Sequence, residues 1–116
     1  MRQELARISI DGKEVPIVRD PEGERIEMTI EGQTAFMTYR LKEGVLSLIH
    51  TEVPQRLRHK GIGEALARFV LDYAGNLGYT VKPYCPFVAG FIKRHPEYEA
   101  VVAPGFSRSP DADADI

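Results

Sequence analysis

One amphipathic segment limits most strongly what this chain can fold into. Apolar side chains recur over residues 62–77 at the three- and four-residue spacing of a single helix face, and Gly78 follows directly. Such a stripe has to be buried against another layer, and a glycine after the last periodic residue commonly ends a helix. The pattern therefore predicts one helix over 62–77. Its stripe consists of Ile62, Ala65, Leu66, Phe69, Val70, Tyr73, Ala74 and Leu77.

The layer beneath this helix is predicted from the residues before it. Three runs between residues 25 and 53 alternate apolar with polar side chains, and short links that contain Gly32 and Gly44 separate them. Alternation with period two is typical of strands, and short glycine-containing links join antiparallel neighbours. Leu5, Ile8 and Ile10 suggest a further short strand near the start. We expect an antiparallel meander.

The residues after Gly78 predict one strand and one more helix. A strand is expected from Tyr79 onward, and Pro86 is placed as the first residue of a helix that Pro96 ends. Phe87, Val88, Phe91 and Ile92 would form its buried face, and Val101 with Val102 suggests a short edge strand. The predicted fold class is α+β, with a mixed, mostly antiparallel sheet and two main helices.

Length and composition predict a small single domain. A chain of 116 residues with 43% hydrophobic and 28% charged side chains has the globular mix, and it is too short to enclose a multi-layer active site. We expect one domain over residues 1–104 with an open ligand groove. The polar, acidic residues 105–116 are expected to be a flexible tail.

Charge and cysteine usage exclude several classes of protein. The formal net charge is -2, and three of the acids are Asp111, Asp113 and Asp115, without which the net charge is +1. Neither value is large enough to attract nucleic acid or anionic membranes through overall charge. The single Cys85 excludes an intramolecular disulfide, and three scattered histidines show no metal-ligand spacing. No apolar run approaches the roughly 20 residues that span a bilayer, and no signal peptide is seen, so we expect a cytoplasmic protein.

A basic loop before the long helix is the first candidate site. Arg56, Arg58 and Lys60 precede Gly61 and Gly63, which open the helix. Unpaired N–H groups and the positive end of the helix dipole bind anions there, and several cations suit a pyrophosphate.

Other interpretations of this loop stay open. Two standard phosphate loops do not fit, because Glu64 stands where one needs lysine and Leu66 where the other needs its third glycine. The glycines alternatively permit a tight turn beside a solvated basic face. Nucleic-acid binding is a further alternative, but no aromatic residue is interleaved with the cations.

Cys85 and His50 are candidate catalytic residues. If Pro86 is the first helical residue, Cys85 is the N-cap, where the helix dipole favours the thiolate and makes a nucleophile. The alternative is a small buried apolar residue. His50 ends an apolar strand and can accept a proton near neutral pH, or it is simply an exposed strand histidine.

Taken together, these segments resemble the GNAT superfamily of acetyl-CoA-dependent N-acetyltransferases. The Arg58-to-Gly63 segment is similar to the Arg/Gln-x-x-Gly-x-Gly/Ala motif that holds the coenzyme A pyrophosphate. Segments 50–54, 83–87 and 95–98 resemble the small single-domain branch, the YjdJ-type or GTLP-type proteins. The resemblance spans roughly residues 25–102. It implies a V-shaped split between central strands, in which the pantetheine arm lies.

The resemblance also implies roles for single residues. Backbone amides of the loop would line the pyrophosphate, Val53 would offer main-chain hydrogen bonds to the pantetheine arm, and Cys85 would lie near the thioester with His50 as its partner. We further expect Lys93 and Arg94 to approach the 3′-phosphate end. The expected pyrophosphate-binding residues are Arg58, His59, Lys60, Gly61, Ile62 and Gly63.

Two departures from the family pattern matter. The branch commonly has glycine at the position of His59, which leaves the path of this loop open. Larger GNAT enzymes have two helices after their first strand, whereas residues 11–24 show no helical period. We therefore expect an open acceptor groove that suits a bulky amine, such as a protein lysine or N-terminus.

The predicted function is acetyl-CoA-dependent N-acetyl transfer to an amine by a monomer or weak dimer. In the preferred route Cys85 takes the acetyl group, or protonates the departing thiolate, while His50 handles protons. Direct attack by the amine is the other route. The alternative function is a coenzyme A or acyl-CoA binding module with little or no turnover.

Overall fold

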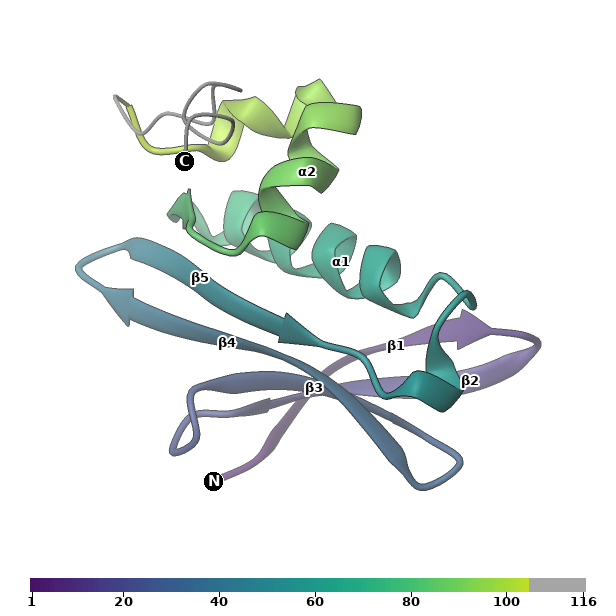
Figure 1. The fold of residues 1–116 in the computed structure, drawn as a ribbon. Coiled ribbons are helices and arrows are strands. Elements are labelled where there is room, and N and C mark those ends of the chain that lie inside the picture. Colours follow the sequence, from purple (N-terminus) through teal and green to yellow (C-terminus); the bar gives the residue numbers. More distant parts are fainter. Residues whose placement is uncertain (105–116) are drawn as a thin grey trace.

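A six-stranded sheet with two helices on one of its faces makes up the fold (Figure 1). The computed structural model describes residues 1–104, so the predicted tail at 105–116 lies outside the described residues. The strands are β1 (Gln3–Ile10), β2 (Lys13–Asp20), β3 (Arg25–Ile30), β4 (Gln33–Lys42), β5 (Val45–Glu52) and β6 (Thr80–Pro83). The helices are α1 (Ile62–Leu77) and α2 (Pro86–Arg94), with short 3-10 segments η1 (Gln55–Leu57) and η2 (Pro96–Val101).

The strands lie in the sheet in the order in which they occur in the chain. The first five pair antiparallel, as expected for a meander, and β5 pairs parallel with β6 after the crossover through α1. The predicted α+β class, with a mostly antiparallel sheet and two main helices, is confirmed. Residues 11–24 form β2 and two turns without a helix, as the missing helical period predicts.

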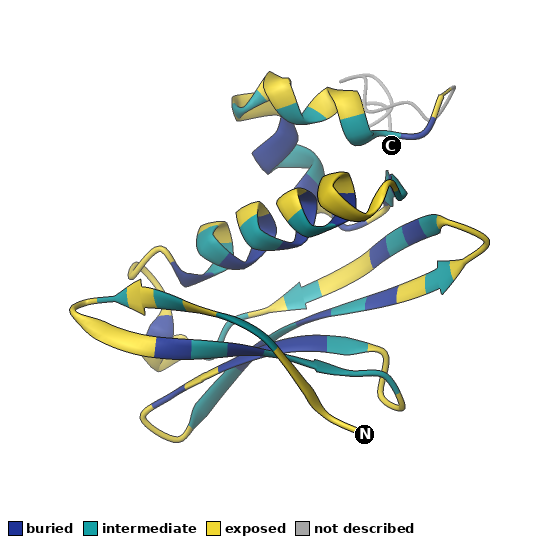
Figure 2. Ribbon diagram, turned by 180° about the vertical axis from the view of Figure 1, so that it is seen from behind, coloured by how far each residue is buried: buried dark blue, intermediate teal, exposed yellow. Residues whose placement is uncertain are grey.

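The core lies between the helices and the sheet. The buried side of α1 faces the strands (Figure 2) and consists of Ile62, Leu66, Ala67, Val70, Leu71 and Ala74. The predicted helix is confirmed residue for residue, and Gly78 ends it in the left-handed conformation. The stripe differs from the prediction in two ways: Leu77, in the last turn, is 51% exposed, and Ala67 and Leu71, which were not predicted to belong to it, are fully buried.

The pairing of β5 with β6 stops halfway along β5. Thr80 to Pro83 pair with Val45 to Leu48, and the backbone N–H of Cys85 then donates to the Leu48 carbonyl at 2.9 Å. Among the described residues, no strand pairs with positions 49–52 on the edge of β5 that faces β6. The two central strands therefore diverge, and the predicted V-shaped split is confirmed.

A β-bulge in β5 reverses its alternation at the point where the split begins. Thr38 of β4 pairs with His50, but the next residue pairs with Leu48, so Ile49 is an extra residue. Leu46 and Leu48 face the helices, and the added residue brings Thr51, not His50, to that same side.

The end of the described chain differs from the prediction. Instead of an edge strand, residues 96–101 form η2, and Val102 makes a single parallel bridge to Val81. None of the helices within residues 1–104 is long and apolar enough to cross a membrane.

Candidate active site

The loop before α1 reaches the helix through two left-handed residues. His59 has φ 67° and Gly61, the N-cap, has φ 76°. No side chain caps the helix, and the first helical hydrogen bond runs from the Ala65 N–H to the Gly61 carbonyl at 2.9 Å. The N–H groups of the first helical turn, at positions 62–64, therefore lack partners within the helix, as is general at helix starts.

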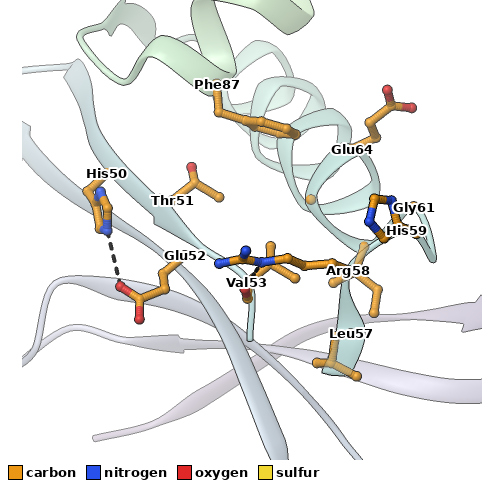
Figure 3. Close-up of a pocket in the computed structure, with 12 residues that line it drawn as sticks. His50, Thr51, Glu52, Val53, Leu57, Arg58, His59, Gly61, Glu64 and Phe87 are labelled. Carbon is orange, nitrogen blue, oxygen red and sulfur yellow. Dashed lines mark hydrogen bonds and ion pairs between the residues drawn. The ribbon is translucent and has the colours of Figure 1, made fainter. Parts of the chain in front are cut away.

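A cavity of about 630 Å³ lies at this helix start (Figure 3). The end of β5, the loop, the first turn of α1 and one residue of α2 form its walls. The lining residues are His50, Thr51, Glu52, Val53, Leu57, Arg58, His59, Gly61, Ile62, Gly63, Glu64 and Phe87. The cavity thus joins an uncapped helix N-terminus, which attracts anions, to the unpaired edge of β5.

Gly63 allows the aromatic wall of the cavity to form. A Cβ atom at this position would lie 2.9 Å from Cζ of Phe87, closer than side chains normally approach. In its present position the ring packs directly against the start of α1 because residue 63 has no side chain. Phe87 was expected on the buried face of α2, but it is 39% exposed and faces the cavity.

Of the three loop cations, only Arg58 lines the cavity. Its Nε donates to the Val53 carbonyl at 3.0 Å, so its side chain lies across the cavity towards β5 (Figure 3). Lys60 instead has its Nζ 3.8 Å from Asp11 Oδ2, in the turn between β1 and β2. The charge of Lys60 also acts on Glu31. The pKa of Glu31 is lowered, mainly by its hydrogen bond with Lys13 and in small part by Lys60.

The basic end of α2 reaches the same helix start indirectly. Arg94 Nη2 lies 3.4 Å from Oε2 of Glu64, which is in the first turn of α1 and lines the cavity. Lys93 is exposed on α2 and does not line the cavity. Arg94 therefore lies near the loop, and its charge faces a carboxylate there.

Cys85 is the N-cap of α2 and Pro86 follows at the helix start, as predicted. Its side chain is only 2% exposed and does not line the cavity. The sulfur lies 3.3 Å from the hydroxyl of Thr51, which does line it. Thr51 therefore separates Cys85 from the cavity.

His50 lies on the opposite face of β5 from the Thr51–Cys85 contact. Its Nε2 is 3.3 Å from Oε1 of Glu52, and both side chains are 59% exposed. Figure 3 shows this pair on one side of the strand and Thr51 pointing towards Phe87 on the other. The sulfur thus contacts Thr51, whereas the imidazole contacts a carboxylate.

A family comparison agrees with this geometry. A family model described as GCN5-related N-acetyl-transferase matches residues 25–101, more than half of the chain. The chain belongs to the GCN5-related N-acetyltransferase family. The match begins at β3 and ends in η2, so it includes the bulged β5, the loop and both helices of this GNAT protein.

Five residues that line the cavity of this GNAT protein were not among the predicted site residues: Thr51, Glu52, Leu57, Glu64 and Phe87. Thr51 and Glu52 follow His50 directly, but the bulge that sorts them to different faces depends on pairing with β4. Phe87 meets Gly63 across 24 positions of sequence, which no local pattern reveals. Within residues 1–104, no group of three or more histidine, cysteine, aspartate or glutamate side chains is arranged to hold a metal ion.

We expect the His59→Gly variant of this GNAT protein to be more stable than the parent. His59 occupies a left-handed conformation, which costs a residue with a Cβ atom about 1 kcal/mol and costs glycine almost nothing. After the entropy that glycine adds to the unfolded chain, the free energy of unfolding should rise by about 0.5 kcal/mol in urea titrations.

Lys60→Gly is the matched control, because the φ of Lys60 is not positive: the variant relieves no strain, adds unfolded-state entropy and loses the exposed ion pair with Asp11. That variant should be less stable than the parent. A loss of stability in both variants would contradict the strain assigned to His59.

Proposed function

We propose that the protein transfers an acetyl group from acetyl-CoA to an amine acceptor. One observation carries the proposal: a single cavity connects the uncapped start of α1 to the unpaired edge of β5. An anchor for a diphosphate and an opening for a second substrate thereby lie in one continuous space. Transfer between two bound substrates requires that arrangement.

The coenzyme would be anchored by the loop and the first turn of α1. The N–H groups of residues 62–64 supply donors for the pyrophosphate, and Arg58 adds a cation within the cavity. The Val53 carbonyl accepts from Arg58 but has a second lone pair, so it can also accept from an amide of the pantetheine arm. We assign Arg94, with Lys93 beside it, to the 3′-phosphate.

Burial of Cys85 favours direct attack by the amine over an acetyl-cysteine route. A sulfur that is 2% exposed and separated from the cavity by Thr51 is poorly accessible to a thioester. In direct attack the neutral amine nitrogen bonds to the thioester carbon, the carbon–sulfur bond breaks, and the thiolate leaves. In this route Cys85 forms no bond with the acetyl group, and its sulfur supports Thr51 at the cavity wall.

The acceptor side of the cavity is open enough for an amine on a macromolecule. β2 and its turns occupy the stretch in which larger GNAT enzymes place two helices. Without a helical cover, the far face of the sheet near His50 and Glu52 stays accessible, and both side chains are more than half exposed. We propose a protein lysine or N-terminus as the acceptor.

Ligand binding is the first test of this function. We expect acetyl-CoA and coenzyme A to raise the melting temperature of the protein, and ATP to leave it unchanged at equal concentration. Arg58→Ala should weaken coenzyme A binding about 10- to 100-fold, the range for a lost hydrogen bond to a charged group. Isothermal titration calorimetry measures both constants.

Lys60→Ala is the matched control. It also removes one positive charge from the loop, two residues after Arg58, but the Lys60 side chain does not line the cavity. Its effect on affinity should stay below about threefold, as for a solvent-exposed ion pair. Equal losses in the two variants would mean that only the overall charge of the loop matters, and no binding at all would refute the proposal.

The two chemical routes differ in what happens to Cys85. We expect Cys85→Ala to keep at least a third of the wild-type rate of acetyl transfer, because direct attack needs no thiol. Intact mass spectrometry of the wild type mixed with acetyl-CoA should show no acetyl adduct. An adduct that disappears in Cys85→Ala, together with loss of turnover, would establish the covalent route instead.

Acceptor size is tested by comparing amines. Because the far face of the sheet has no helical cover, we expect faster transfer to a folded protein with exposed lysines than to spermidine or free lysine, at equal amine concentration. Mass spectrometry of the protein and release of free thiol give the two rates. Faster turnover of the small amines would contradict the open-groove argument, and tight coenzyme A binding without any transfer would favour a binding module.

A further inference from the structure

The cavity is reached from both faces of β5. Thr51 lines it from the face that is covered by the helices, and His50 and Glu52 line it from the other face. Both sets of side chains can contribute because the ladder with β6 has ended at Leu48, so the edge of the strand is open. A thioester on the helix side can therefore be approached by an amine from the opposite side.

Three contacts hold His50 on that opposite side. Its Nε2 lies 3.3 Å from Glu52 Oε1, and its ring meets the edge of Phe36 at a centroid distance of 6.4 Å. Its backbone carbonyl accepts a hydrogen bond from the Thr38 hydroxyl at 3.4 Å. Phe36 and Thr38 are the β4 partners of Glu52 and His50, so the same register that creates the bulge also builds this cluster.

The carboxylate determines which ring nitrogen of His50 is free. An ionised carboxylate only accepts hydrogen bonds, so the nitrogen that faces Glu52 must carry the hydrogen. That nitrogen is Nε2, which leaves the lone pair on Nδ1. A neutral imidazole held in one tautomer by a carboxylate is a general base whose accepting atom is defined.

We propose that Glu52 is a positioning residue that holds His50 as the base for the acceptor amine, on the face of β5 opposite Cys85. The proposal rests on the proposed acetyl transfer. It assigns His50 to the acceptor rather than to the cysteine, and it gives Glu52 a role that neither the sequence analysis nor the family match supplies.

The proton balance of the step follows from this placement. An ammonium acceptor gives one proton to His50 Nδ1 and becomes a neutral amine, and the resulting imidazolium is stabilised by the Glu52 carboxylate. The amine nitrogen bonds to the thioester carbon and the carbon–sulfur bond breaks. The second proton of the nitrogen passes to the departing sulfur, and His50 releases its proton to water.

Arg25, whose guanidinium packs on the Phe36 ring on this face of the sheet, is engaged by partners other than Glu52. Arg25 Nε lies 3.1 Å from the nearly buried Glu27, and its guanidinium lies 3.8 Å from the centre of the Phe36 ring. Glu52 thus presents a carboxylate to an incoming ammonium group, which also favours its approach.

Glu52→Gln tests the proposal, because glutamine keeps the size of the side chain and removes its charge. With acetyl-CoA and a peptide whose only amine is one lysine side chain, kcat should fall at least tenfold and the KM of the peptide should rise. The KM of acetyl-CoA should stay within twofold. Glu43→Gln, in the turn at the other end of β5, is the matched control and should leave all three constants unchanged.

Nitrogen-15 NMR of the histidine rings gives a readout that does not depend on turnover. The wild type should show His50 with the hydrogen on Nε2, and Glu52→Gln should show a mixture of the two tautomers. An unchanged tautomer with unchanged kcat would overturn the proposal, as would a loss of activity that raises the KM of acetyl-CoA equally. No transfer by the wild type would overturn the proposed function and the proton step together, and the tautomer measurement would still decide whether Glu52 positions the ring.

Discussion

The site depends on the point at which β6 stops pairing with β5. Pro83 is the last residue of β6 and has no backbone N–H to continue the ladder, and two residues later Cys85 begins to turn the chain into α2. The hydrogen bond from the Cys85 N–H to the Leu48 carbonyl closes the paired region. Beyond it, β5 has an open edge, and the cavity lies along that edge.

A short connection brings the helix start to this opening. Only residues 53–61 separate β5 from α1, so the N-terminus of α1 lies close to the end of the strand. The connection fits because His59 and Gly61 both take left-handed conformations, and the aromatic wall fits because Gly63 has no side chain. Glu64 places a negative charge in the first helical turn, and Arg94 balances it from α2.

Local patterns were sufficient to predict much of the fold but not how the site is divided. The helix over 62–77, its end at Gly78 and the N-cap at Cys85 depend on residues adjacent in sequence, and these predictions hold. The bulge at Ile49 depends on how β4 pairs with β5, and alternation alone would have brought His50 to the helix side. The direction of Lys60 likewise depends on Asp11 in a distant turn, so its sequence position beside Arg58 did not reveal that it points away from the cavity.

The extra residue in β5 also sets how this end of the strand can change. A substitution alters the chemistry of one side chain but leaves every side chain on its own face of the sheet. A one-residue slip of positions 49–52 against β4, which would remove the bulge while keeping Ile49, would instead exchange the two faces for these positions, because strand side chains alternate. Glu52 would then point beneath the helices, and Thr51 outward. The separation of the two sides of the sheet thus depends on the bulge that accommodates one extra residue, and deletion of Ile49 would preserve it in a regular strand.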